Sequence, residues 1–185
     1  MMGTITDNNR VIYLTEEIKD KTIAEVNKTL LKLIKEDNKK EKELKEFKRE
    51  PIEIYINSFG GSVYDALSLV DIIIHSKTPI HTIVTGYAMS AAFIIFLCGT
   101  KRFMSKYATL LLHQVSHYTG GKIGDLEITL AEDQRLQKLL ENIILERTKI
   151  TSSQLEDNRK TKTDWYIPLE EAIKLGCVDE ELIEI

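Results

Sequence analysis

Three residues that lie far apart in the sequence carry groups that could cooperate in acyl transfer: Ser90, His113 and Asp164. A serine hydroxyl becomes a nucleophile when a base lies within hydrogen-bonding reach, and that base needs an acidic group to orient it. The chain holds four histidines and several serines, so residue types alone allow many other trios. The sequence around each residue has to narrow the choice.

Ser90 lies in a stretch that is otherwise apolar apart from the phenol of Tyr87. This stretch, GYAMSAAFIIFLCG (residues 86–99), follows a strand-like run at residues 80–84. The order predicts a strand, a tight turn and a helix whose first turn carries Ser90. The start of a helix offers unpaired N–H groups and positive dipole character, which would stabilise an oxyanion. A small buried serine that only caps a core helix is the competing explanation.

Two other stretches place flexible or polar residues at the ends of predicted strands. A strand at residues 52–56 leads into NSFGGSV (57–63) and an amphipathic helix (63–75). The backbone of Gly60 and Gly61 could approach a ligand there, unless the glycines serve only the turn. His113 directly follows a buried-strand pattern at residues 108–112, and α/β folds place functional groups at such strand ends. A histidine with a purely structural hydrogen bond is the alternative.

The first part of the chain contributes scaffold elements. A short strand at residues 11–14 precedes a helix that we expect to open at Thr15. Apolar residues recur along this helix at helical spacing: Ile23, Val26, Leu30 and Leu33/Ile34. Residues 35–50 are almost entirely charged, and we expect a solvated helix extension or a mobile loop there.

The C-terminal third begins with the longest helical pattern, over residues 125–150. It carries one apolar stripe, made of Leu136, Leu139, Leu140, Ile143 and Ile144, which would pack either on another subunit or on its own sheet. Residues 151–163 are polar and predicted to be turn-like. Pro168 opens a short helix that Gly176 ends, and ELIEI closes the chain as an edge strand. The alternation of strands and helices predicts one α/β domain over residues 1–185.

Composition excludes several classes of protein. With 185 residues, 29% of them charged, and a net charge of −4, the chain has no basic surplus for nucleic acid or an anionic membrane. The longest apolar run, residues 89–98, is too short to cross a bilayer, and no secretory signal is visible. Cys98 and Cys177 lack the spacing of metal ligands or of a disulfide framework. We therefore expect a soluble intracellular protein without a metal or a cofactor.

Several motifs, taken in order, resemble the proteolytic-subunit family of the Clp protease, ClpP, from about residue 11 to the C-terminus. They are RVIYLT (10–15), YINSFGGSV (55–63), GYAMSAAF (86–93), LLLHQ (110–114) and DWYIPLEEAIKLGCVDE (164–180). The resemblance implies a ClpP/crotonase-like α/β fold, in which repeated β-β-α units form a sheet-and-helix head. A long handle helix would protrude from the head within about residues 114–150. Residues 1–10 would be a short N-terminal segment and residues 35–50 a charged insertion.

The resemblance also implies roles for residues of the site. Ser90 would be the nucleophile, His113 the general base and Asp164 the acidic orienter, with Asp157 as the fallback. The backbone N–H groups of Gly61 and Ala91 would form the oxyanion hole. The substrate-binding residues would be Gly60, Gln114, Val115 and Ser116.

The assembly implied by the resemblance is a homo-oligomeric barrel of two stacked heptameric rings. An AAA+ unfoldase of the ClpX, ClpA or ClpC type would deliver unfolded polypeptides to this serine endopeptidase in the cytoplasm, or in the host cytoplasm if a virus encodes the chain. A second ClpP-like subunit stays open as a further partner. Nucleic acid and membrane are not expected as partners.

The chain departs from the family pattern at three positions. Phe59 and Val115 stand where the family usually has proline, and Ala91 stands where it usually has methionine. These differences bear on pocket shape and loop rigidity, whereas an oxyanion contact made by the backbone tolerates Ala91. Two alternative functions stay open: a ClpP-like ring subunit that is catalytically weak or regulates a partner peptidase, and an acyl-CoA enzyme of the crotonase type.

Overall fold

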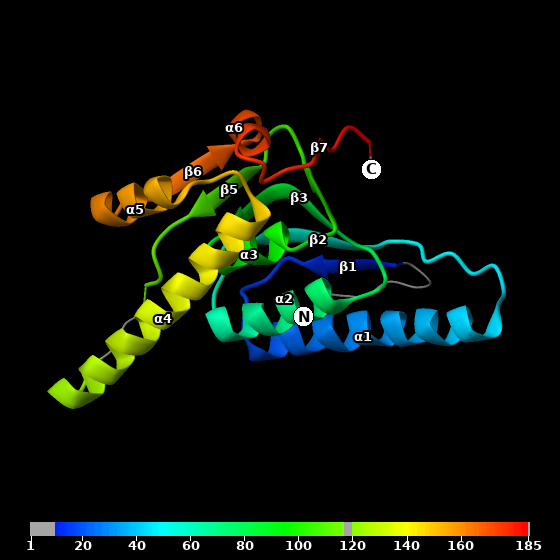
Figure 1. The fold of residues 1–185 in the computed structure, drawn as a ribbon, viewed down its shortest axis with the longest axis horizontal. Coiled ribbons are helices and arrows are strands. Elements are labelled where there is room, and N and C mark those ends of the chain that lie inside the picture. The colour runs from blue at the N-terminus through cyan, green and yellow to red at the C-terminus, as the bar shows by residue number, and fades with distance from the viewer. Residues whose placement is uncertain (1–9, 117–119, 185) are drawn as a thin grey trace.

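A computed structural model describes residues 10–116 and 120–184, which form a parallel-dominated sheet with helices packed around it (Figure 1). The elements are β1 (Val11–Leu14), α1 (Asp20–Glu43), β2 (Ile52–Ser58), α2 (Val63–His75), β3 (Ile80–Met89), α3 (Ala91–Leu97), β4 (Lys101–Met104), β5 (Thr109–Leu112), α4 (Ile123–Arg147), α5 (Ser152–Thr161), β6 (Trp165–Pro168), α6 (Leu169–Lys174) and β7 (Glu180–Glu181). The predicted α/β class is confirmed.

The sheet branches at β3. Among the described residues, parallel strands follow in the order β1-β2-β3-β4-β7. The first half of β3 pairs with β4, whereas its second half pairs with β5. β6 then pairs with β5 in the antiparallel direction. The second half of β3 and the ribbon β5–β6 therefore lie together. The C-terminal strand β7 lies at an edge of the main strand order, but it covers Glu180–Glu181 rather than the whole of the predicted ELIEI segment.

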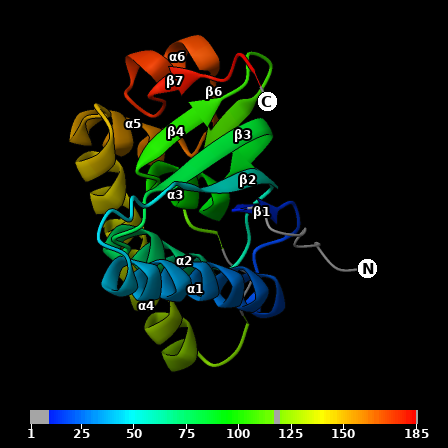
Figure 2. The ribbon, with the colours of Figure 1, turned by 90° about the vertical axis from the view of Figure 1, so that its right-hand side faces the viewer.

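Helices α1 and α2 lie side by side along one face of β1 to β3 (Figure 2). The predicted inner face of α1 is confirmed, because Ile23, Val26 and Leu30 are buried. Every residue of α3 is buried, and this helix contacts α2, α4 and the sheet. In contrast, α4 runs past the head and projects beyond it (Figure 1); of its residues only Leu136 and Ile144 are buried. No helix in residues 10–116 or 120–184 has both the length and the apolar character needed to cross a membrane.

Two boundaries differ from those expected. The first helix begins at Asp20 rather than Thr15, because the intervening residues bond to the glycine loop: Ser58 Oγ donates to the Glu16 carbonyl at 2.6 Å, and the Ile18 N–H donates to Gly60. Residues 151–163, expected to be turn-like, contain α5 instead. Its start has a reciprocal capping box between Thr151 and Gln154, a signal that the polar composition concealed.

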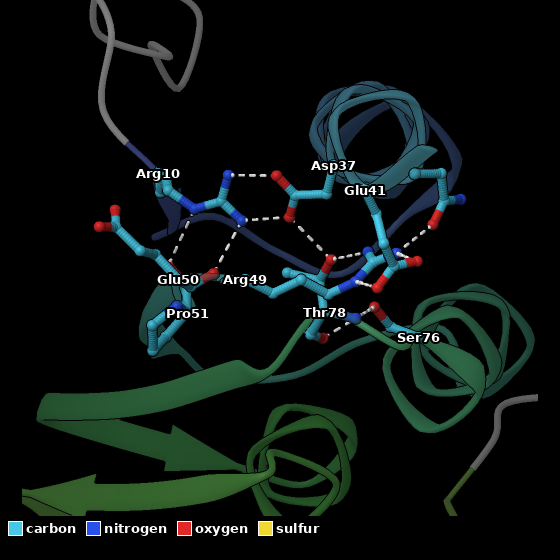
Figure 3. Close-up of polar contacts among 9 residues, drawn as sticks. Arg10, Asp37, Glu41, Arg49, Glu50, Pro51, Ser76 and Thr78 are labelled. Atoms are coloured by element: carbon cyan, nitrogen blue, oxygen red, sulfur yellow. Dashed lines mark hydrogen bonds and ion pairs between the residues drawn. The ribbon is translucent and has the colours of Figure 1, made fainter. Parts of the chain in front are cut away.

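The charged stretch at residues 35–50 extends α1, as expected, but it is not fully solvated. Asp37 is 0% exposed. Arg10 donates to its two carboxylate oxygens at 3.0 and 2.6 Å, and the Thr78 hydroxyl donates at 2.8 Å. Arg49 returns from the loop after α1 and donates to Thr78 Oγ1 at 2.7 Å and to Glu41 (Figure 3). These contacts join the start of β1, the end of α1 and the start of β3.

The protonation of Asp37 is governed by these partners. Burial alone would raise its pKa, but the hydrogen bonds from Arg10 and Thr78 and the charges of Arg10 and Arg49 outweigh burial, so the pKa lies below its ordinary value. A carboxylate with a lowered pKa in the folded state stabilises the fold above its unfolded pKa of about 4. That stability is lost as the pH falls through the folded-state pKa.

We predict that Asp37→Asn lowers the free energy of unfolding at neutral pH by about 3 kcal/mol, because it leaves the partly buried Arg10 against an uncharged group. The difference between the variant and the wild type should shrink as the pH falls below about 4. Urea unfolding at fixed protein concentration and several pH values measures both effects. Glu36→Gln, at the exposed neighbouring position, is the control and should change stability by less than about 0.5 kcal/mol. A loss that does not depend on pH would contradict the electrostatic explanation.

Candidate active site

The glycine loop after β2 passes directly against the turn between β3 and α3. A Cβ atom on Gly60 would lie 2.7 Å from the Met89 carbonyl oxygen and 2.8 Å from Ser90 Cβ. Gly60 also has a φ of 99°, and Gly61 a φ of 145°, which side chains disfavour. Close approach and backbone conformation therefore both require glycine at Gly60.

Ser90 occupies the position immediately before the first residue of α3, as the sequence predicts. Its backbone has φ 55° and ψ −124°, and its hydroxyl makes no capping hydrogen bond. Ser90 therefore has the cap position of α3, but its side chain does not cap the helix. A non-glycine residue in this conformation is strained, and a strained serine on a strand-to-helix turn presents its hydroxyl outward. The Ser90 N–H anchors the turn by donating to the Leu111 carbonyl at 3.0 Å.

The pairing of β3 with β5 brings His113 close to this turn. Met89 pairs with Leu111, so Ser90 lies beside Leu112, and His113 is the next residue. A cavity of about 350 Å³ borders Gly61, Ser90 and His113. Its apolar wall is formed by Val63, Ile94, Leu112, Leu140 and Ile144, and Phe59, Val115, Ser116 and Gln137 complete its lining.

Asp164 lies one residue before β6, and the register relates it to His113. The last pair of the antiparallel β5–β6 ladder is Leu112 with Trp165, so one further pair would set His113 opposite Asp164. In the structure Asp164 is exposed and borders a separate depression that also includes Asp157. Among the described residues, no hydrogen bond joins His113 to Ser90 or to Asp164.

The two residues whose backbone amides are expected to form the oxyanion hole are Gly61, which lines the cavity with Ser90, and Ala91, which follows Ser90 in the chain. Ile18 forms a parallel bridge with Gly61 by bonding to Gly60 and Ser62. In such a bridge the N–H of the central residue, here Gly61, points away from the partner segment. The Ala91 N–H belongs to the first residue of α3 and has no acceptor within the helix.

The expected substrate-binding residues are not equally available. The Gly60 N–H donates to Ser58 Oγ at 3.2 Å and its carbonyl accepts the Ile18 N–H at 2.8 Å. Gln114 and Ser116 are exposed. The Val115 N–H donates to Gln137 Oε1 at 2.8 Å. Sequence reasoning missed Gln137, because a side-chain amide on a long polar helix carries no pattern that points to a partner 22 positions away.

Other reactive side chains in the described residues do not offer a competing site. His75 Nδ1 lies 2.8 Å from the Asp71 carbonyl, and His81 packs against Phe103 near the start of β3, at the end remote from Ser90. Burial raises the pKa of the Cys98 thiol to about 11 and that of the Cys177 thiol to about 12, which keeps both unreactive. The fourth histidine, at position 117, lies outside the described residues. No cluster of His, Cys, Asp and Glu side chains within the described ranges could hold a metal ion.

Comparison with known proteins gives a consistent result. The family model of the Clp protease matches residues 2–184. An ATP-dependent Clp protease proteolytic subunit from Streptococcus mutans is 34% identical over 176 residues, which are 93% of this chain and 84% of the relative. Subunit 1 from Prochlorococcus marinus is 32% identical over 92% of this chain and 82% of the relative, and the Bacteroides fragilis subunit is 32% identical over 95% and 80%.

These matches extend far beyond the cavity. The family model runs from residue 2 to residue 184, and each relative named above is itself matched over four-fifths of its length or more. The acyl-CoA alternative is not favoured by them. Similarity along whole chains, with a single hydroxyl presented on a strained turn, shows that this protein belongs to the Clp protease family, a family of serine peptidases.

Proposed function

We propose that Ser90 is the nucleophile of a serine endopeptidase subunit, with His113 as the general base and Asp164 as the group that orients it. The observation that carries this proposal is the Ser90 hydroxyl, which makes no capping bond, stands on a strained turn and shares one cavity with His113 and Gly61. A serine held in this way at an energetic cost of about 1–3 kcal/mol is better explained by reactivity than by packing.

The reaction follows from these positions. His113 accepts the proton of Ser90 as Oγ attacks the peptide carbonyl, and the oxygen that becomes negative receives hydrogen bonds from the N–H groups of Gly61 and Ala91. His113 then protonates the leaving amine, which departs and leaves an acyl-enzyme. Water, deprotonated by His113, releases the acyl group and regenerates Ser90. Every proton transfer in this scheme passes through His113, whereas the two amides only donate hydrogen bonds.

The scheme needs His113 to reach both of its partners. Catalytic hydrogen bonds are often long or absent before substrate binds. The β5–β6 register supports Asp164 over Asp157, because one more ladder pair would bring the Cβ atoms of His113 and Asp164 to about 5 Å. Asp157 lies on α5 and has no such register partner. We therefore expect that in the catalytically competent state the β5–β6 ladder gains one further pair, His113 with Asp164.

The cavity indicates how a peptide would bind. Its apolar wall suits an apolar side chain, and the exposed residues Gln114 and Ser116 would pair with the peptide backbone as an added strand. Backbone pairing depends little on sequence. This mode therefore suits a peptidase that cleaves unfolded polypeptides of many sequences.

Membership of the family implies an oligomer that works with ATPase partners. We propose the finer arrangement of two stacked heptameric rings in the cytoplasm, fed by an AAA+ unfoldase of the ClpX, ClpA or ClpC type. The uncovered face of α4 supports contact between copies: Ile123, Leu126 and Leu130 recur at i, i+3 and i+7 and are 78%, 36% and 58% exposed. They continue the helix face that packs on the head through Ile144.

Ser90→Ala should abolish cleavage of short fluorogenic peptides and covalent labelling by a fluorophosphonate. Ser116, the other described serine in the cavity lining, lies on the exposed segment after His113 and not on the strained turn before α3. Rates of hydrolysis and intact-protein mass measure the two effects. Ser153→Ala, on the exposed surface of α5, is the control and should behave like the wild type. Labelling that persists in Ser90→Ala would refute the assignment of the nucleophile.

Asp164→Asn should lower kcat on the order of 10³- to 10⁴-fold while KM changes little, since an amide cannot stabilise the imidazolium that forms. Asp157→Asn is the matched control, because the two carboxylates border the same depression. We expect Asp157→Asn to retain most of the activity. If Asp157→Asn lost activity and Asp164→Asn retained it, Asp157 would be the orienting residue.

Leu130→Lys should weaken assembly between rings, because it buries a charge in the apolar face of α4. Analytical ultracentrifugation should show the loss of the largest species and the gain of one of half its mass. Asn142→Lys, which adds the same charge at an exposed position nearer the C-terminal end of α4, is the control and should assemble like the wild type. An unchanged sedimentation profile for Leu130→Lys would show that this face does not join the rings.

A further inference from the structure

Three side chains form a hydrogen-bonded chain from the segment after His113 to α5. Gln137 Oε1 accepts the Val115 N–H at 2.8 Å, and Gln137 Nε2 donates to Glu141 Oε1 at 2.9 Å. Arg159 Nη1 donates to the two Glu141 oxygens at 3.1 and 3.3 Å. Gln137 and Glu141 lie one turn apart on α4, whereas Arg159 belongs to α5.

Both ends of this chain adjoin residues of the proposed catalytic set. Val115 lies two residues after His113, and Val115 and Gln137 line the cavity with Ser90. At the other end, α5 ends just before the loop that leads to Asp164. The side-chain amide of Asn158, in α5, donates to the carbonyl of Thr163 in that loop at 2.8 Å.

We propose that Gln137, held by Glu141 and Arg159, is a positioning residue that fixes the segment carrying His113. It acts on catalysis through the Val115 N–H rather than by touching substrate. The proposal rests on the proposed function, in that it assigns a role relative to His113.

The chemistry of the three groups determines which way the Gln137 amide points. An ionised carboxylate can only accept hydrogen bonds, so Glu141 draws the NH₂ group of Gln137 and leaves the carbonyl oxygen for the Val115 N–H. Arg159 in turn holds Glu141, whose side chain is only 17% exposed. A hydrogen bond to an ionised partner is about twice as strong as a neutral one, so the chain keeps Gln137 in one rotamer.

Other contacts attach α4 to the head without help from Gln137. Leu136 and Ile144 are buried, and the Tyr64 hydroxyl of α2 donates to Glu132. Loss of the Gln137 amide should therefore disturb the segment at residues 113–116 more than the packing of α4. A positioning role therefore predicts a loss of activity with little loss of stability, whereas a merely structural role predicts a loss of stability.

The first test replaces the amide by an apolar side chain of similar size. Gln137→Leu leaves the partly buried Val115 N–H without an acceptor, and we expect kcat for a short fluorogenic peptide to fall about tenfold. KM should stay within about twofold and the midpoint of thermal unfolding should change little, because binding and packing surfaces are retained. Lys138→Leu, at the exposed neighbouring position, is the control and should match the wild type.

The second test removes the N–H instead of its acceptor. Val115→Pro has no N–H to satisfy, so adding Gln137→Leu to it should cost less than about twofold in kcat. The four proteins form a double-mutant cycle whose coupling term measures the contact. An equal loss in both backgrounds would show that Gln137 acts by another route, and wild-type kcat for Gln137→Leu would overturn the proposal outright.

Ser90-dependent labelling separates this proposal from the assignment of the nucleophile. If fluorophosphonate labelling needs Ser90 but proceeds at the wild-type rate in Gln137→Leu, the positioning role fails and the nucleophile stands. If labelling does not depend on Ser90, the proposed function itself fails, whatever the Gln137 variants do.

Discussion

The contact between Gly60 and the Ser90 turn is the constraint on which the site depends. The segments that follow the paired strands β2 and β3 approach so closely that a single added methyl group on Gly60 would overlap the Met89 carbonyl and Ser90 Cβ. Gly61, the next residue of the glycine loop, borders the same cavity as Ser90. The close approach also explains why residues 15–18 do not join α1: they are needed as hydrogen-bonding partners that hold the glycine loop in place.

The strain at Ser90 is balanced by its surroundings. The turn is attached to β5 through the Ser90 N–H and to α3 through the Ser90 carbonyl, which accepts the Phe93 N–H at 3.0 Å. Helix α3 is buried on all sides, so it cannot rotate to relieve the unfavourable backbone angles of Ser90. An apolar helix of seven residues thus serves as a fixed support for one polar atom.

Sequence patterns predicted those parts of the protein whose stabilising contacts are local. Periodicity and short-range signals predicted the strand at residues 80–84, the helix face of Ile23, Val26 and Leu30, and His113 at a strand end. They ended the strand too early, because β3 continues to Met89. The patterns did not reveal Asp37 as buried, because a carboxylate in a charged run looks solvated until Arg10 and Thr78 arrive from 27 and 41 positions away. Gln137 escaped notice for the same reason. The role of Gln137 depends on its hydrogen bond with the Val115 N–H, and only the tertiary fold brings these two residues together.

The branching of the sheet at β3 divides the proposed catalytic groups between two bodies. Ser90 and the two amides belong to the block built on β1 to β3 and α3, whereas His113 and Asp164 flank the β5–β6 ribbon, which joins that block through three residue pairs. A small shift of the ribbon along β3 would change the distance between Ser90 and His113. The distance between His113 and Asp164 would stay the same, because both residues flank the ribbon. The separation of Ser90 from His113 therefore depends on the β3–β5 pairing, whereas that of His113 from Asp164 depends on the β5–β6 ladder.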